Sequence, residues 1–389
     1  MLTRSLKLFR DIPERLKTSA NKTSFNFESR FLELNGVSLT EFIDIGFILY
    51  SAALSNTGFV GDYFDKARAQ GISLPPDSSI GAIIEQFAAD LIEMRATYER
   101  YKQPDRRYAA YDFNPLWVYP LVRPWTSGAT PNWTDYRFMA PLPQLVLSRM
   151  SGGIYSQLFH HFKGDFANYF GVLFENYVGD LLRESFPAAN MLSESDLRKK
   201  YQSDRGKVPD WVVFEGKTAT LIECKATGLS AKALATADSA ATDYGVDQIV
   251  RGLIQLHEFK ESCLKKLDGL EILHSCTRLN LLLVTYEPFY LINSEPFRNI
   301  INAKLELVLK SQNIALTDWQ VLSIGELEKL QPHLAASIGL GNVFRDLKSS
   351  KDFNSVLERC HAQTGKTYRD SFLYETDIEI YQRLKVPHE

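Results

Sequence analysis

The sequence lacks the marks of a zinc knuckle, a disulfide-linked secreted domain or a membrane span. Its four cysteines form no CxxC pair and have no histidines at zinc-ligand spacing, so we expect reduced, buried thiols. The longest strongly apolar run, residues 45–54, is far shorter than the roughly 18 residues that a membrane span needs. The first 17 residues contain no continuous apolar segment followed by a small-residue cleavage site. We therefore expect a cytoplasmic protein that does not bind membranes.

The chain also lacks an excess of charge of either sign. It has 44 Lys and Arg residues against 47 Asp and Glu residues, a formal net charge of −3. A nucleic-acid surface would therefore have to be a local patch, because no global basic field attracts a polyanion. With 389 residues, of which 45% are hydrophobic, the chain is long enough for about two to three domains with large cores.

Three regions are expected from the patterning. Residues 1–150 are predicted to form a mostly helical domain, all-α over about the first 100 residues, with helices over 39–54 and 80–101. Its last part, 104–145, combines seven prolines with three tryptophans, which suggests an ordered but irregular connector that packs at a domain interface. Residues 151–310 are predicted to form an α/β core. Residues 311–389 are predicted to be a C-terminal extension, a strand and helices, packed on that core.

Within the core, the element order is helix, strand, strand, helix, strand. The first helix covers 165–187 with an apolar stripe at 3.6-residue spacing, and a second follows over 244–264. Between them lies a hairpin, 207–227, and a strand is predicted over 279–287. The segment 188–205 has room for one further strand. Both faces of the second hairpin strand are largely apolar, which is typical of a central strand covered by helices on each side.

The hairpin KVPDWVVFEGKTATLIECKAT carries charges that an apolar strand pair does not need. If Gly216 and Lys217 form a two-residue turn, Asp210 stands opposite Glu223, with Cβ atoms about 4.5 to 5.5 Å apart. Two carboxylates so close repel each other unless a cation lies between them. Oxygen ligands without His or Cys suit Mg²⁺ or Mn²⁺. Lys225, on the same face as Glu223, is placed to orient an attacking water.

The motif "PD", followed thirteen positions after its aspartate by "ECK", resembles the signature of the PD-(D/E)xK nuclease superfamily. The resemblance implies a restriction-endonuclease-like core, a mixed sheet flanked by helices in the order αβββαβ, over about 165–290. It also implies that Asp210 and Glu223 bind the metal and that Lys225 assists the water. A glutamate on the preceding helix, Glu175 here, completes such sites as a further metal ligand, and Gln248 is our choice for a glutamine on the following helix.

Two observations bear on the flanking helices independently of the resemblance. Glu175 borders the apolar stripe of its helix, and the residues four positions before and after it are Gly171 and Gly179, which permit close approach of another backbone. On the later helix, Gln255 lies on the same face as Gln248 and begins "QLHEF", similar to the Gln-x-x-x-Tyr motif of the exonuclease branch, with phenylalanine at the tyrosine position. We expect Gln255 to be a helix-surface residue or to support the site indirectly.

Together these features predict a magnesium-dependent endonuclease that hydrolyses DNA, in restriction, repair or defence against phage. The resemblance implies products with a 5′-phosphate and a 3′-hydroxyl. Two alternatives stay open: an inactive module of the same fold that binds nucleic acid or a partner protein, and a ribonuclease, since nothing identifies a sugar discriminator. A basic run that includes Lys200 and Lys207 is a candidate for phosphate contacts or an ordinary solvated loop. The sequence specifies neither endo- nor exonucleolytic cleavage, and it leaves open a homo-oligomer or a subunit of a larger complex.

Overall fold

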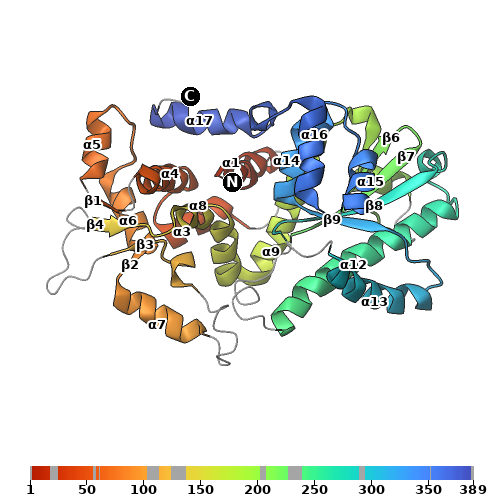
Figure 1. Ribbon diagram of the computed structural model, residues 1–389, viewed down its shortest axis with the longest axis horizontal. Coiled ribbons are helices and arrows are strands. Elements are labelled where there is room, and N and C mark those ends of the chain that lie inside the picture. Colours follow the sequence, from red (N-terminus) through yellow and green to blue (C-terminus); the bar gives the residue numbers. More distant parts are fainter. Residues whose placement is uncertain are drawn as a thin grey trace. The chain divides into compact units, whose positions relative to one another are not determined.

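The structure of the protein is a computed structural model that divides the chain into two compact units (Figure 1). It describes residues 2–17, 25–55, 58–60, 62–102, 114–123, 137–201, 207–226, 239–288, 294–350 and 352–386. Unit 1 comprises the described residues up to Tyr169 and those from Leu373 onward. Unit 2 comprises the described residues between Phe170 and Phe372.

Unit 1 is mostly helical, as expected, but it also contains a small sheet. Its helical elements are α1 (Leu2–Leu6), η1 (Lys7–Asp11), α2 (Ile12–Leu16), α3 (Phe27–Asn35), α4 (Leu39–Ser55), α5 (Tyr63–Ala69), α6 (Asp77–Phe87), α7 (Leu91–Tyr101), η3 (Pro115–Trp117), α8 (Pro143–Arg149), the first part of α9 (Gly152–Arg183), and α17 (Tyr374–Leu384). The strands β1 (Gly58–Val60), β2 (Ala88–Ala89), β3 (Leu121–Val122) and β4 (Arg137–Met139) form a sheet in the order β1-β4-β3-β2.

The expectation that the first 100 residues are all-α is therefore wrong. The helix predicted over 80–101 is broken where Ala88 turns to extended backbone and Asp90 caps α7, accepting hydrogen bonds from the amides of Ile92 and Glu93. The apolar periodicity continues through this break and predicts one helix. The capping side chain of Asp90 nevertheless starts a second helix there. Most of the Pro- and aromatic-rich connector, residues 103–113 and 124–136, lies outside the described residues.

The two ends of the chain meet inside unit 1. Arg10 binds both carboxylate oxygens of Glu379, at 2.5 and 2.7 Å, and Arg383 binds the buried Asp44. Bidentate arginine–carboxylate pairs fix orientation as well as contact. This division differs from the predicted one, because the last helix belongs with the N-terminal unit while residues 311–372 continue unit 2 rather than form a separate extension.

Among the described residues, no single helix is both long and apolar enough to cross a membrane. Only α3 and α4 taken together pass that test of length and composition, and a bend of 48° separates them. Much of α4 is buried inside unit 1, including Phe42, Ile43 and Leu49.

Unit 2 is an α/β unit built on a mixed sheet in the order β5-β6-β7-β8-β9. The first three strands pair antiparallel and the last three pair parallel. The strands are β5 (Met191–Ser193), β6 (Trp211–Glu215), β7 (Thr218–Lys225), β8 (Arg278–Thr285) and β9 (Trp319–Ser323). The helices are the second part of α9, α10 (Glu194–Lys200), α12 (Ser239–Leu264), α13 (Glu295–Ser311), α14 (Ile324–Ala335), α15 (Leu340–Ser350) and α16 (Phe353–Thr364), with short 3₁₀ turns at η5 (Ala188–Asn190), η7 (Glu271–Leu273) and η8 (Tyr368–Asp370).

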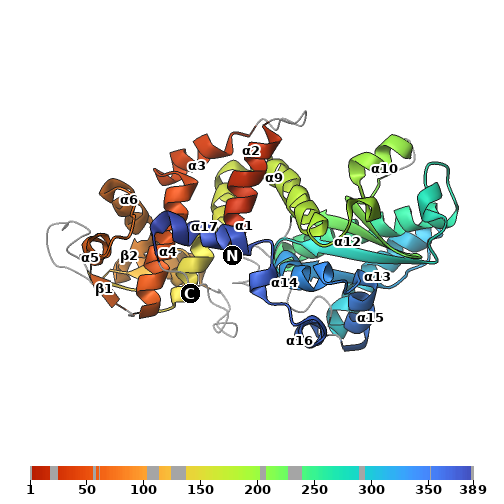
Figure 2. The same cartoon turned by 90° about the horizontal axis from the view of Figure 1, so that it is seen from above.

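Helices cover both faces of this sheet (Figures 1 and 2). In Figure 1, α12 and α13 lie on one side of the strands, and α14, α15 and α16 lie on the other. The buried core on the α12 side includes Leu221 and Leu283 from the sheet, Leu253 and Leu256 from α12, and Leu305 from α13. The apolar residues on both faces of β7 are thereby explained, and the predicted strands over 188–205 and 279–287 are confirmed.

The hairpin register is the one that the sequence predicts. Residues 211–215 pair with 218–222 in order, so that Trp211 stands opposite Ile222 and Glu215 opposite Thr218. Gly216 occupies the first central position of the turn with φ of 62°, a conformation that glycine adopts without strain. This register carries Asp210, Glu223 and Lys225 to the face of the sheet that α12 covers.

Helix α9 is docked onto the hairpin by a tryptophan and a glycine. A Cβ atom at Gly179 would lie 2.2 Å from the Trp211 ring, so the indole packs directly against the bare helix backbone there. The same indole Nε1 donates a hydrogen bond to the carbonyl oxygen of Glu175 at 3.2 Å. The predicted close approach thus occurs at Gly179, made by a side chain rather than a backbone, whereas a Cβ at Gly171 would meet nothing within 4 Å.

The two glycines of α9 give a matched stability test. We expect Gly179→Ala to lower the free energy of unfolding by about 1 to 3 kcal/mol, because the new methyl group displaces the Trp211 ring. Gly171→Ala should leave stability unchanged or raise it by up to about 1 kcal/mol, through helix propensity alone. Urea denaturation of both variants measures the difference, and equal effects at the two positions would contradict the packing described here.

Candidate functional site

Three carboxylates from separate elements converge at one edge of the unit 2 sheet. Glu175 comes from α9, Glu194 is the first residue of α10, and Asp210 immediately precedes β6. Each offers a carboxylate oxygen, and these three oxygens lie within 4.8 Å of one another. All three residues are half-buried. The group contains only hard oxygen donors, the donor set that suits Mg²⁺, Mn²⁺ or Ca²⁺.

Backbone pairing places two of these acids side by side. β5 pairs with β6 so that Ser193 stands opposite Trp211, and the next backbone hydrogen bond runs from Glu194 N to Asp210 O at 2.8 Å. On its other side, Asp210 accepts a hydrogen bond through Oδ2 from the amide of Cys224 at 2.6 Å. Asp210 therefore lies between the start of α10 and the end of β7, held by both neighbouring strands.

Glu223 and Lys225 form a second cluster beside Asp210. Glu223 is 2% exposed, and its Oε1 accepts a hydrogen bond from Lys225 Nζ at 2.5 Å. Its Oε2 accepts one from Gln255 Nε2 at 2.6 Å. Gln255 Nε2 also donates to the carbonyl oxygen of Val208 at 3.0 Å, which ties α12 to the segment that leads to Asp210. Both oxygens of Glu223 therefore have donors within the protein.

A glycine on α12 makes room for the lysine. A Cβ atom at Gly252 would lie 2.6 Å from a methyl group of Leu283 and 3.1 Å from Cε of Lys225. Without that Cβ, the apolar stem of Lys225 can lie against the helix while its ammonium reaches Glu223. Gly252 and Gln255, one turn apart on α12, thus position the two charged groups at the end of β7.

Burial and mutual repulsion raise the pKa values of the acids in both clusters. Burial, then the charges of Asp210 and Glu194, raise the pKa of Glu175 to about 7. Burial also raises the pKa of Asp210 to about 6, against the hydrogen bond from Cys224. For Glu223, burial and the charge of Asp210 raise the pKa to about 8. Burial lowers the pKa of Lys225, but the charge and hydrogen bond of Glu223 together with the charge of Asp210 outweigh it, so the pKa is raised and the ammonium stays protonated. A bound cation would favour the ionised form of every one of these acids.

The structure brings together most of the residues that the sequence singles out. Glu175 and Asp210 share the three-acid group, and Glu223 and Lys225 lie next to it, although the predicted ligand Glu223 is hydrogen-bonded to protein donors. Gln248 is half-buried on α12 and, within the described part of the chain, makes no hydrogen bond to these acids. For Gln255 we expected either a place on the helix surface or indirect support of the site; it is 8% exposed and donates a hydrogen bond to Glu223, which agrees with the second alternative.

Sequence reasoning missed Glu194. Its neighbours Ser193 and Asp196 form a capping box at the start of α10, so the run SESD has a sufficient local explanation as a helix start. The available signal was positional: an acid directly after an edge strand that pairs with the strand following Asp210. Gln255 had a signal in "QLHEF", the segment noted above for its similarity to a nuclease motif.

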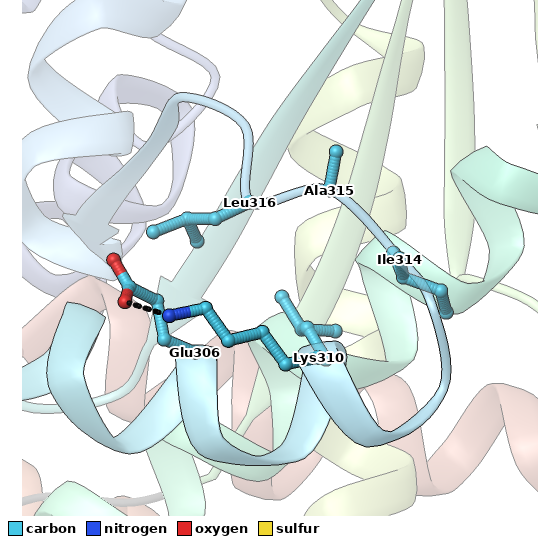
Figure 3. Close-up of a pocket in the computed structure, with 6 residues that line it drawn as sticks. Glu306, Lys310, Ile314, Ala315 and Leu316 are labelled. Carbon is cyan, nitrogen blue, oxygen red and sulfur yellow. Dashed lines mark hydrogen bonds and ion pairs between the residues drawn. The ribbon is translucent and has the colours of Figure 1, made fainter.

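A small cavity elsewhere in unit 2 is not part of this site. It has a volume of about 260 Å³ and lies between the end of α13 and the segment before β9 (Figure 3). Its lining residues are Glu306, Leu309, Lys310, Ile314, Ala315 and Leu316. Lys310 and Glu306 pair at 3.1 Å, which leaves a mainly apolar wall without a further charged group.

No protein-family model matches this chain, and no curated protein or solved structure gives a significant match.

The raised pKa values predict how stability without metal depends on pH. A carboxyl whose pKa is higher in the folded than in the unfolded state contributes its full stability at low pH. That contribution is lost as the pH rises from the unfolded pKa through the folded pKa. For Glu175, Asp210 and Glu223 this window runs from about pH 4.5 to 8. Glu175→Gln removes one of the charges, so in EDTA it should be more stable than the parent at pH 8, on the order of 1 kcal/mol after allowance for partial exposure, and similar at pH 5.

Denaturation at both pH values checks this expectation. Glu184→Gln, which changes an exposed carboxylate just beyond the end of α9, is the matched control and should show no such difference. If Glu175→Gln were less stable than the parent at pH 8, repulsion among the acids would not contribute significantly to the free energy of unfolding.

Proposed function

We propose that the protein is a phosphodiesterase that hydrolyses DNA with Mg²⁺ or Mn²⁺, acting in the cytoplasm in restriction, repair or defence. The observation that carries the proposal is the convergence of three carboxylate oxygens within 4.8 Å of one another, next to the Lys225–Glu223 pair. Like charges held together in a half-buried place are stabilised by a cation. A lysine beside such a group suits a reaction in which negative charge increases at phosphorus.

The proposed fold of unit 2 is the restriction-endonuclease-like core. Its element order α9, β5, β6, β7, α12, β8, apart from the short α10, is the αβββαβ order that the motif implies. The antiparallel β5-β6-β7 pairing followed by parallel β8 supports the proposal. β9 and the helices after it would then be additions to that core.

The donor set fits the proposed ion. Glu175, Glu194 and Asp210 would hold it, since they supply carboxylate oxygens from three elements without competing nitrogen or sulfur donors. An ion held there would supply positive charge that stabilises the phosphoryl oxygens and favours ionisation of the attacking water.

The side chains of the chain itself would do the remaining work. Lys225, kept protonated by Glu223, orients the attacking water and offsets charge at the phosphate. Water oxygen forms the new bond to phosphorus while the bond to the 3′ oxygen breaks. The water proton passes to solvent, because a cation held by Glu175 would lower the pKa of that carboxyl and make it a poor proton acceptor near neutral pH. The leaving 3′ oxygen takes a proton from solvent, which yields a 3′-hydroxyl and a 5′-phosphate.

Two substitutions test this function. Asp210→Asn removes a charge at the centre of the site, and Lys225→Met removes the ammonium while it keeps the stem; each should reduce Mg²⁺-dependent cleavage of DNA by at least about 100-fold. Plasmid, linear and single-stranded DNA, and RNA, are incubated with Mg²⁺, Mn²⁺ or EDTA. Glu184→Gln serves as the control that retains activity. Thermal denaturation verifies that each variant is folded.

Three outcomes are informative. Undiminished cleavage by both Asp210→Asn and Lys225→Met would remove the proposed site, and cleavage of RNA alone would replace the substrate. In the parent protein, millimolar Mg²⁺ should raise the melting temperature, through binding to the folded state only, and Asp210→Asn should abolish that shift. No shift and no cleavage of any substrate in the parent would favour a binding module instead.

A further inference from the structure

Helix α10 places an arginine beside the three acids. Arg198 lies one turn after Glu194, and its Nε and one terminal nitrogen both contact the same oxygen, Oε1 of Glu194, at 2.7 and 2.6 Å. The side chain of Arg198 is 41% exposed, and that of Glu194 is 32% exposed. Figure 2 shows α10, the helix that carries both residues, projecting from the sheet of unit 2.

We propose that Arg198 binds a backbone phosphate of the nucleic-acid substrate and, as it does so, releases Glu194 to the divalent cation. This inference rests on the proposed function and names a second role at the same site. A guanidinium has five N–H groups, and only two of them are used on Glu194 in the described part of the chain. The remaining three face away from that oxygen and can donate to a phosphate.

The chemistry of the pair favours exchange over a fixed contact. The two donors converge on one carboxylate oxygen, so the contact lacks the parallel two-oxygen geometry of a bidentate ion pair. Ion pairs with this degree of exposure contribute little to stability, so this one can be exchanged at little cost. A backbone phosphodiester carries the same single negative charge as the Glu194 carboxylate, and its two free oxygens match the planar fork of the guanidinium, so it can compete for Arg198.

The same arginine affects the cation. While Arg198 contacts Glu194, its positive charge opposes a divalent ion at that carboxylate, so the free protein binds the ion less tightly than the acids alone would. Once a phosphate engages Arg198, Glu194 becomes available as a ligand. Binding of nucleic acid and binding of the ion thereby reinforce each other, as two linked equilibria must.

Neighbouring residues set the context and provide a control. Lys199 pairs with Asp196 at 3.4 Å, and Asp196 is not one of the three acids. Lys200, the last residue of α10, and Lys207 are both exposed. Lys199→Ala removes the same unit of charge as Arg198→Ala, one residue away, without touching Glu194.

The test separates ion binding from nucleic-acid binding. Calorimetric titration of Mn²⁺ should give tighter binding in Arg198→Ala, by about fivefold, and an unchanged affinity in Lys199→Ala. Fluorescence anisotropy of a labelled DNA oligonucleotide, at saturating Ca²⁺ and in a Lys225→Met background that suppresses cleavage, should give weaker binding in Arg198→Ala. The slope of log affinity against log salt should fall by about one. Arg198→Lys should retain the charge and recover only part of the oligonucleotide affinity.

Opposite changes in the two affinities are specific to this proposal, because a purely structural role for Arg198 would weaken both. Mn²⁺ affinity that is unchanged or reduced in Arg198→Ala, or oligonucleotide binding equal to that of Lys199→Ala, would overturn it while the proposed function stands. A parent protein that binds no ion and cleaves nothing would overturn the proposed function, and this inference with it.

Discussion

Repulsion between half-buried carboxylates is the constraint on which the arrangement of this site depends. Glu175, Glu194 and Asp210 bring ligand oxygens within 4.8 Å of one another. Two unit charges at about 4 Å repel by roughly 4 kcal/mol at the effective dielectric of a protein surface, so the fold must hold these groups together against a considerable force. The protonation equilibria respond in the expected direction, with the pKa of Glu175 raised to about 7. A cation removes the repulsion without any change in the backbone.

The backbone, rather than the side chains, keeps the acids from separating. Asp210 is held by a backbone hydrogen bond from Glu194 and by a side-chain contact to the amide of Cys224, both direct consequences of the β5-β6-β7 register. Glu175 is fixed through its own carbonyl oxygen, which accepts the indole hydrogen bond of Trp211. Moving any acid away would require breaking strand pairing or lifting α9 from the hairpin. The interactions that oppose the repulsion are therefore the strand pairing and helix packing of unit 2.

Local patterns sufficed for the parts of this site that depend on short-range rules. Gly216 fixed the turn, the turn fixed the register, and the register placed Asp210 beside the end of β7. Glu194 could not be found in this way, since its contact with Asp210 arises from pairing between β5 and β6, and a three-residue strand leaves almost no periodicity in the sequence. The sequence also could not show whether Gln248 or Gln255 contacts the site, because this depends on which turn of α12 crosses β7. Gly252 lies at that crossing, against Lys225 and Leu283, and so brings Gln255 to the site.

Over the whole chain, the sequence predicted which segments are helices and strands better than it predicted how these segments group into the two units. The long helices of unit 2 have apolar stripes that identify them, whereas β1 and β2 are too short to interrupt a helical pattern visibly. The division into units depends on contacts between the ends of the chain, such as Arg10 with Glu379, which no local window contains. Residues 319–323 join the main sheet beside β8 by parallel pairing, which is also a long-range choice.

Two acids of the site form ion pairs with basic side chains, Glu223 with Lys225 and Glu194 with Arg198. The two pairs differ in exposure, which suggests different roles. Glu223 is buried and Lys225 is half-buried, with side-chain exposures of 3% and 23%, and removing the ammonium would leave the buried carboxylate uncompensated at a cost of several kcal/mol. Arg198 and Glu194 are more exposed, at 41% and 32%, so their separation costs much less. Lys225 is therefore the fixed positive charge of the site, present in every state. Arg198 is the one that can leave its carboxylate, and a polyanionic ligand is the partner that would draw it away.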